Sequence, residues 1–193
     1  MRLRILDSGH SLATKAMFAL IRTASRNAVL DIIKLVKYRA DFYGTPMSAV
    51  THEAMRGPST WSVGDRELMA AIVAKTNACA FCIDAHAAVA RRAYSDEAKV
   101  AAVLDDLESA PIDERLRATL RMLKKLSVEH SVSTDDMRAL LACGVSRAQI
   151  EDALAVAFAF NTITRLAEAF GFVVPSAGAM DAGAKFLLAR GYR

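Results

Sequence analysis

The stretch from Ser62 to Arg92 constrains the fold of this chain more than any other part of it. Ser62 is followed three residues later by Asp65, a pattern that begins a helix through reciprocal capping hydrogen bonds. Apolar residues then recur at the spacing of one helix face as far as Asn77, a poor helix former that predicts a turn. The alanine-rich sequence after the turn predicts a second helix. The stretch is therefore interpreted as two consecutive helices.

The rest of the chain has the same helical character. Apolar residues at helical spacing, bounded by capping residues, Gly and Pro, predict further helices, and no alternating strand pattern persists. The composition is 53% apolar but only 7% aromatic, which favours helices packed closely through small side chains. We therefore expect an all-α bundle of roughly seven to nine helices. Among them are helices over 27–38, 46–55 and 95–107, with Asn27, Thr45 and Ser95 as N-caps.

The chemically distinctive residues are Cys79, Cys82 and His86. Residues three, four and seven apart share one face of a helix, so these three side chains should form one short stripe. A helix N-terminus or a nearby imidazolium lowers the pKa of a thiol into the range where the thiolate is well populated. Cysteines at i and i+3 can also form a disulfide, so the pair predicts a redox-active dithiol.

Two other interpretations of the cysteine pair remain open at this point. The thiols could be two small buried apolar side chains, which is a common environment for Cys. They could also hold a structural zinc, for which Cys143, His52 or His130 would have to supply further ligands from elsewhere in the chain. Three cysteines are too few for a disulfide scaffold.

A family resemblance becomes specific when Glu67 is included. The pattern Glu67, eleven residues, Cys79-Ala-Phe-Cys82, three residues, His86 resembles the core motif of the alkylhydroperoxidase D-like (AhpD-like) branch of the carboxymuconolactone decarboxylase-like superfamily. Further points of resemblance are Arg66-Glu67-Leu68, Asn77 and the segment Phe160-Asn161 with Arg165-Leu166-Ala167. One departure is Phe81, at a position where the founding type of the family carries a second histidine.

The resemblance implies an oligomeric all-helical enzyme, often a trimer or hexamer, with peroxidase or disulfide-reductase activity. It implies that Cys82 attacks the peroxide, that Cys79 resolves the intermediate, and that Glu67 and His86 form a proton relay. No bound cofactor or metal is implied, and a protein or small thiol would supply the electrons. The alternatives are a decarboxylase-type acid–base enzyme that uses Glu67 and His86, or a non-catalytic oligomeric stress or assembly module.

The domain organisation follows from length and resemblance together. A chain of 193 residues fits one domain, and we expect a single AhpD-like domain over 1–193. Within it we expect an N-terminal helical arm (1–60), a core with the cysteine motif (62–171) and a C-terminal helix (172–193).

Charge and hydropathy bear on partners and location. The formal charge is +4, but no dense Lys/Arg cluster or interleaved aromatics appear, so nucleic-acid binding is not expected. The longest uncharged apolar stretch, near 153–160, is far shorter than the ~18 residues of a membrane span. Nothing at the N-terminus resembles a secretion signal. We therefore expect a cytoplasmic protein that does not enter the membrane.

Overall fold

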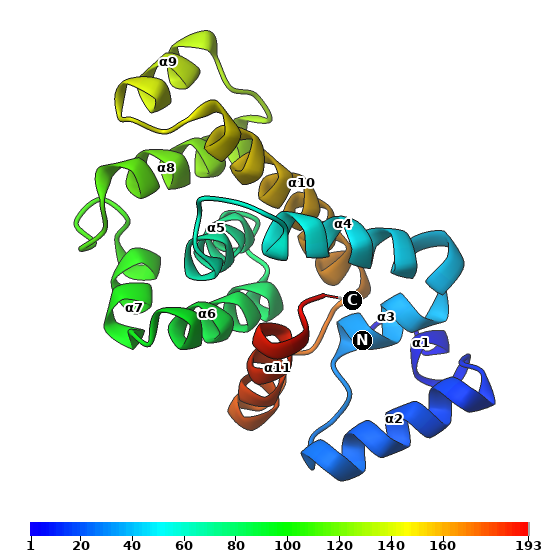
Figure 1. The fold of residues 1–193 in the computed structure, drawn as a ribbon. Helices are drawn as coiled ribbons and strands as arrows, with labels where there is room; N and C mark the ends of the chain where they lie inside the picture. The colour runs from blue at the N-terminus through cyan, green and yellow to red at the C-terminus, as the bar shows by residue number, and fades with distance from the viewer. Residues whose placement is uncertain (193) are drawn as a thin grey trace.

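The computed structural model describes residues 1–192, and the regular secondary structure in that range is entirely helical (Figure 1). It contains eleven α-helices and one π-helix and no strand within these residues, which confirms the predicted all-α class. The elements are α1 (Ile5–Ser8), α2 (Leu12–Ser25), α3 (Asp31–Tyr38), η1 (Ala40–Gly44), α4 (Thr45–Arg56), α5 (Val63–Thr76), α6 (Ala80–Tyr94), α7 (Glu97–Asp105), α8 (Glu114–Glu129), α9 (Thr134–Ala142), α10 (Arg147–Phe170) and α11 (Ala177–Arg190).

The predicted count of seven to nine helices is wrong because the N-terminal part is divided into short pieces. The four-residue helix α1 ends at Gly9, and Arg26 ends α2 in the left-handed conformation, with φ 55°. Asn27 does not cap the next helix. Its side-chain amide donates to the carbonyl of Ser25 over 2.7 Å, and α3 begins only at Asp31.

Two further predicted N-caps are also corrected. Ser95 adopts φ 53° and ends α6, while the side chain of Asp96 accepts a hydrogen bond from the Lys99 amide and begins α7. Thr45 is the first residue of α4 and makes no side-chain cap, because the π-helix η1 runs directly into α4 at Gly44. A Cβ on Gly44 would lie 1.9 Å from the Val36 carbonyl oxygen, so this junction requires glycine.

The capping patterns of the central and long helices are confirmed. Ser62 and Asp65 form the expected capping box at the start of α5, and Ser146 and Gln149 form another at the start of α10. Asn77 is the C-cap of α5. These contacts involve neighbours three residues apart, so the local sequence suffices to predict them.

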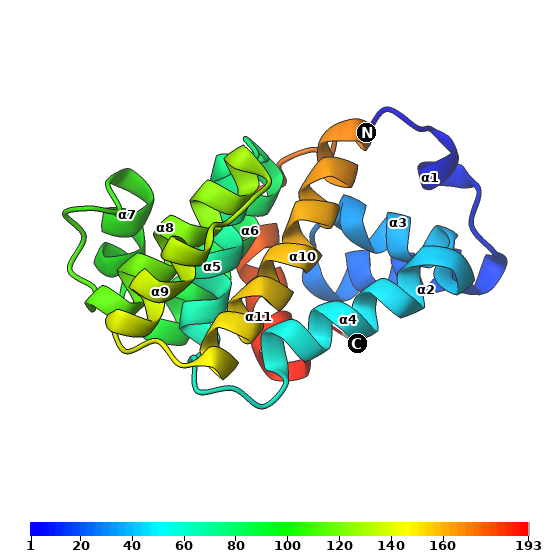
Figure 2. The same ribbon diagram turned by 90° about the horizontal axis from the view of Figure 1, so that it is seen from above.

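Helix α5 lies at the centre of the bundle, packed against α4, α6, α8 and α10 (Figure 1). Its buried residues include Leu68, Met69, Ala70, Ala71, Val73 and Ala74. The alanines among them allow neighbouring helices to approach closely. Helix α6 packs along α5, and α11 covers α6. The segments α1–α3 and α7–α9 lie at opposite ends of the molecule (Figure 2). The predicted cysteine helix is thus held between the central helix and α11.

Helix α10 meets the length and composition criteria for crossing a membrane. One of its faces, however, packs into the core against α4, α5 and α8, and includes Val156, Phe160 and Ile163. A helix with one apolar face packed into the core is typical of a core element in a helical bundle.

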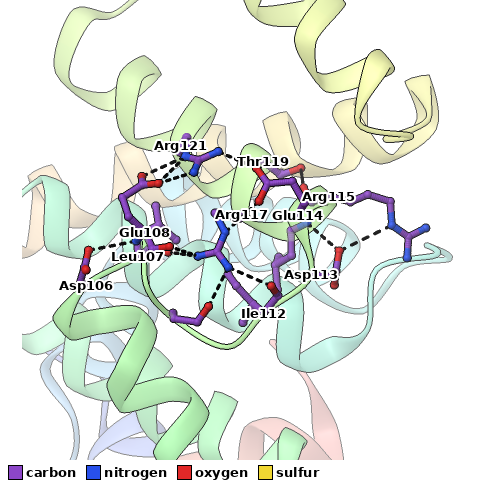
Figure 3. Close-up of polar contacts among 12 residues, drawn as sticks. Asp106, Leu107, Glu108, Ile112, Asp113, Glu114, Arg115, Arg117, Thr119 and Arg121 are labelled. Carbon is purple, nitrogen blue, oxygen red and sulfur yellow. Dashed lines mark hydrogen bonds and ion pairs between the residues drawn. The ribbon is translucent and has the colours of Figure 1, made fainter.

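The side chain of Arg117 holds the loop between α7 and α8 in place (Figure 3). The guanidinium of Arg117 donates to four backbone carbonyls of this loop, those of Leu107, Glu108, Ala110 and Ile112. A loop without regular structure leaves such carbonyls unpaired, and a planar guanidinium with five donors can satisfy several of them at once. Arg117 therefore fixes the path of the chain between the two helices.

Candidate active site

The turn between α5 and α6 places the two cysteines. The side-chain amide of Asn77 donates to Asn161 Oδ1 and to Thr164 Oγ1, each over 2.9 Å, so the turn is anchored to α10. Ala78 then adopts φ 54°, a left-handed conformation that is unfavourable for alanine. This reversal makes Cys79 the N-cap residue of α6.

Cys79 and Cys82 lie together at the beginning of α6. Their Sγ atoms are 2.8 Å apart, both cysteines are free, and neither is more than 2% exposed. The ring of Phe81, between them in sequence, packs edge-on against Phe172 with centroids 5.3 Å apart. The spacing of three residues therefore brings the two thiols into direct contact in a largely dry environment.

The surroundings of the two thiols favour a thiolate on Cys79. A hydrogen bond with the Cys82 thiol lowers the pKa of Cys79 below its ordinary value and outweighs the opposing effect of burial. The same contact, together with burial, raises the pKa of Cys82. The N-cap position of Cys79 acts in the same direction, because unpaired amides at a helix N-terminus favour an anion. These opposite shifts make Cys79 the first of the two thiols to lose its proton.

The second half of the site is the pair formed by Glu67 on α5 and His86 on α6. Glu67 Oε2 lies 2.7 Å from His86 Nδ1, and the glutamate is completely buried. An ionised carboxylate only accepts hydrogen bonds, so Nδ1 carries the proton and Nε2 is the nitrogen that can exchange one. The imidazole is also held edge-on against Phe160, with centroids 4.3 Å apart.

The other oxygen of Glu67 is occupied by two side chains that sequence reasoning missed. Arg56 Nη2 and the Tyr192 hydroxyl each lie 2.8 Å from Glu67 Oε1 and donate to it. Burial alone would raise the pKa of Glu67, but the contacts with His86 and Arg56 outweigh it and keep the pKa below its ordinary value. No motif spacing connects Arg56 or Tyr192 with Glu67, so only the tertiary structure could identify them.

A second tyrosine, Tyr43, contributes a polar group near the thiols. Burial is the main cause that raises the pKa of Tyr43 to about 12, with a smaller contribution from the neighbouring Cys82, so the phenol stays protonated at neutral pH. Its hydroxyl is buried and has no hydrogen-bond partner among the residues that the structure describes. Tyr43 lies in η1, and π-helical turns are frequently found at functional sites.

The structure thus brings the four predicted site residues together as two pairs: the two thiols at the start of α6, and Glu67 of α5 with His86 of α6. Across residues 1–192, however, no hydrogen bond joins His86 to either sulfur. The residues considered as extra zinc ligands lie in other surroundings. Cys143 is exposed at the end of α9, His130 ends α8 in a left-handed conformation, and His52 accepts a hydrogen bond from the Tyr192 amide.

Comparison with known proteins finds a family similarity in the segment that carries the site. Residues 43–125 match the carboxymuconolactone decarboxylase family, and the matched segment contains both thiols, Glu67 and His86. No curated protein matches the chain.

Three solved structures have a similar fold. An uncharacterized peroxidase-related protein from Silicibacter sp. TM1040 is 25% identical, with a TM-score of 0.73 over 86% of this chain and 85% of that chain. A peroxidase-related protein from Ralstonia eutropha JMP134, described as an alkylhydroperoxidase AhpD core, is 21% identical, with a TM-score of 0.75 over 92% of both chains. The debrominase Bmp8 is 14% identical, with a TM-score of 0.67 over 90% of this chain and 92% of that chain.

Proposed function

We propose that this chain, whose residues 43–125 match the carboxymuconolactone decarboxylase family, is an AhpD-like thiol-dependent peroxidase. The substrate is a hydroperoxide, and a dithiol, either a small molecule or a protein, supplies the electrons. The observation that carries this proposal is the contact between two free, buried sulfurs, 2.8 Å apart, one helical turn before His86.

The first step uses the thiolate of Cys79. It attacks the terminal oxygen of the hydroperoxide, an S–O bond forms, and the O–O bond breaks. The departing alkoxide takes the proton of the Cys82 thiol and leaves as an alcohol. Cys79 is then a sulfenic acid, and Cys82 is a thiolate in contact with it. This order of events reverses the roles expected from the resemblance, and the lowered pKa of Cys79 supports the reversal.

The second step closes the disulfide. The Cys82 thiolate attacks the sulfur of the sulfenic acid, and the departing hydroxide takes a proton from the imidazolium of His86 to become water. Glu67 stays ionised and holds Nδ1, so that Nε2 is the atom that releases the proton. An external dithiol then reduces the disulfide. That reaction restores one thiolate and one thiol and returns one proton to His86.

Access to the sulfurs requires movement of the side chains that cover them. Both cysteines are buried, and a surface groove of about 620 Å³ between α6 and α11 is lined by Arg91, Arg92 and Asp181, not by the cysteines. Small organic hydroperoxides are therefore the substrates to test first.

The test is single-turnover oxidation of the fully reduced protein by cumene hydroperoxide, followed by thiol counting and trapping with dimedone. We expect two thiols to be lost in the wild-type protein, and a dimedone adduct on Cys79 in the Cys82→Ser variant. Cys143→Ser serves as the control, because that exposed thiol lies at the end of α9 and should not affect turnover.

Two results would overturn parts of the proposal. An adduct on Cys82 in Cys79→Ser, with none on Cys79 in Cys82→Ser, would restore the order expected from the family resemblance. Full activity in the Cys79→Ala/Cys82→Ala double variant would exclude dithiol chemistry. Activity of that variant on a lactone acid would favour the acid–base function of Glu67 and His86.

A further inference from the structure

The chain after α11 turns back toward the active site. Helix α11 ends at Arg190, and Gly191 adopts φ 69° and ψ −150°, a conformation that reverses the chain direction. A Cβ on Gly191 would lie 2.6 Å from the His52 ring, so both the conformation and the space require glycine. The amide of Tyr192 donates to His52 Nδ1 over 3.2 Å. Tyr192 is therefore fixed by its backbone as well as by its side chain.

The side chain of Tyr192 contacts every member of the Glu67 network. Its hydroxyl donates to Glu67 Oε1 over 2.8 Å. Its ring stacks on the imidazole of His86, with centroids 6.4 Å apart and an interplanar angle of 20°. The guanidinium of Arg56 lies 5.1 Å from the centre of the same ring, in cation–π geometry.

The hydroxyl of Tyr192 is a permanent donor. Burial and the neighbouring charge of Glu67 raise the pKa of Tyr192 well above its ordinary value, so the phenol does not ionise in the working pH range. A completely buried carboxylate needs donors on both oxygens, because each unpaired oxygen is costly away from water. With Oε1 held by Tyr192 and Arg56, Oε2 remains the oxygen that faces His86.

We propose that Tyr192 is a positioning residue of the active site. Its hydroxyl fixes the rotation of the Glu67 carboxylate, and its ring fixes the plane of the His86 imidazole, so activity depends on docking of residues 191–192. Arg56 reinforces this docking, because Nη2 of Arg56 also donates to the carbonyl of Leu187 near the end of α11, over 3.1 Å. This inference rests on the proposed function, since it assigns Tyr192 a role in the same site.

The test compares Tyr192→Phe with Tyr94→Phe. Both changes remove a tyrosine hydroxyl that donates to a carboxylate, but Tyr94 donates to Asp65 at the start of α5 and contacts neither Glu67 nor His86. For Tyr192→Phe we expect kcat for cumene hydroperoxide to fall by about tenfold with little change in KM, because a misaligned proton carrier slows the chemistry. For Tyr94→Phe we expect wild-type kcat.

A second readout does not need activity. An Nδ1 proton held by a carboxylate gives a far-downfield signal in the proton spectrum, and a ¹⁵N-histidine label with a His86→Gln variant assigns that signal. We expect the signal to move upfield or broaden in Tyr192→Phe and to stay in place in Tyr94→Phe.

The outcomes separate the two proposals. Absence of peroxide reduction in the wild-type protein contradicts the proposed function, and the NMR comparison still decides the role of Tyr192. Wild-type kcat together with an unchanged Nδ1 signal in Tyr192→Phe overturns the positioning role and leaves the proposed function intact.

Discussion

Nδ1 of His86 lies 2.7 Å from Oε2 of Glu67, across nineteen residues of sequence and between two different helices. The contact exists because α5 and α6 pack along each other after the turn at Asn77. Since Arg56 donates to the other carboxylate oxygen, Glu67 serves as a fixed anion that orients the imidazole. In the proposed mechanism, His86 Nε2 is then the atom that exchanges protons with the reacting thiols.

Replacing Glu67 by Gln should impair catalysis strongly. An amide can donate a proton as well as accept one, so the preferred imidazole tautomer is no longer fixed. We expect kcat for hydroperoxide reduction to fall by about 10²- to 10⁴-fold, the range for losing general acid–base assistance. The measurement is steady-state turnover with excess dithiol. Glu151→Gln, an exposed change on α10, is the matched control, and an equal loss in both variants would contradict the assignment.

The same substitution should change how stability depends on pH. The pKa of Glu67 lies below its ordinary value of 4.5, so the native state binds this proton less readily than the unfolded chain. The stabilising contribution of Glu67 is therefore complete above about pH 5 and is lost as pH falls through the native pKa.

Urea unfolding at several pH values would measure this effect. At pH 7 we expect Glu67→Gln to be less stable by about 3 kcal/mol, because the largely covered guanidinium of Arg56 loses its charged partner. Between pH 5 and 3 the slope of stability against pH should be smaller in the variant, by up to ~1.4 kcal/mol per pH unit for one titrating proton. A slope equal to that of the wild-type protein would mean that Glu67 does not titrate in this range.

Ala78 gives a prediction about the turn that carries the cysteines. Its φ of 54° is unfavourable for a residue with a Cβ, and its side chain is exposed. Ala78→Gly should therefore stabilise the protein by about 0.5–1 kcal/mol. Ala101→Gly, at an exposed position within α7, should destabilise it by a similar amount. Chemical denaturation would measure the stability of both variants. Destabilisation by Ala78→Gly would contradict the conclusion that the backbone of Ala78 is strained.

Arg117 gives a prediction about stability away from the site. Arg117→Ala removes the guanidinium donor from four loop carbonyls, of which that of Ala110 still accepts from the Ile112 amide, and we expect a loss of about 2–4 kcal/mol. Arg115 is its control, since its exposed side chain makes only a 3.7 Å ion pair with Asp113, and Arg115→Ala should cost less than about 0.5 kcal/mol. Thermal unfolding would compare the two, and equal effects would contradict the role of Arg117.

For Tyr43 we predict a substitution that increases stability. Its buried hydroxyl has no partner within the part of the chain that the structure describes, and an unpaired buried hydroxyl is destabilising. Tyr43→Phe should therefore raise the free energy of unfolding by about 1 kcal/mol. Tyr94→Phe, which removes a satisfied hydroxyl, should lower it. Lower stability in Tyr43→Phe would show that the hydroxyl has a partner, such as an ordered water.

Much of the local structure could be predicted because it depends on near neighbours. The capping boxes at Ser62 and Ser146 and the end of α5 at Asn77 follow from residues three or four apart. Prediction failed where competing local conformations were similar in energy. Ser95 can cap a helix or adopt a left-handed turn, and the next residue, Asp96, caps α7 instead. The N-terminal part divided into short helices because the chain leaves the helical conformation at Gly9 and at the left-handed Arg26.

The sequence by itself determined the contact between Cys79 and Cys82 and the position of His86 one turn later, because helix geometry fixes what lies three and four residues apart. The pairing of Glu67 with His86 required the family pattern as well. Only the tertiary structure decided that Arg56 and Tyr192 hold the second oxygen of Glu67, the latter from 125 residues away. Such contacts depend on how whole helices pack and on where the chain returns after α11, and no local spacing encodes that.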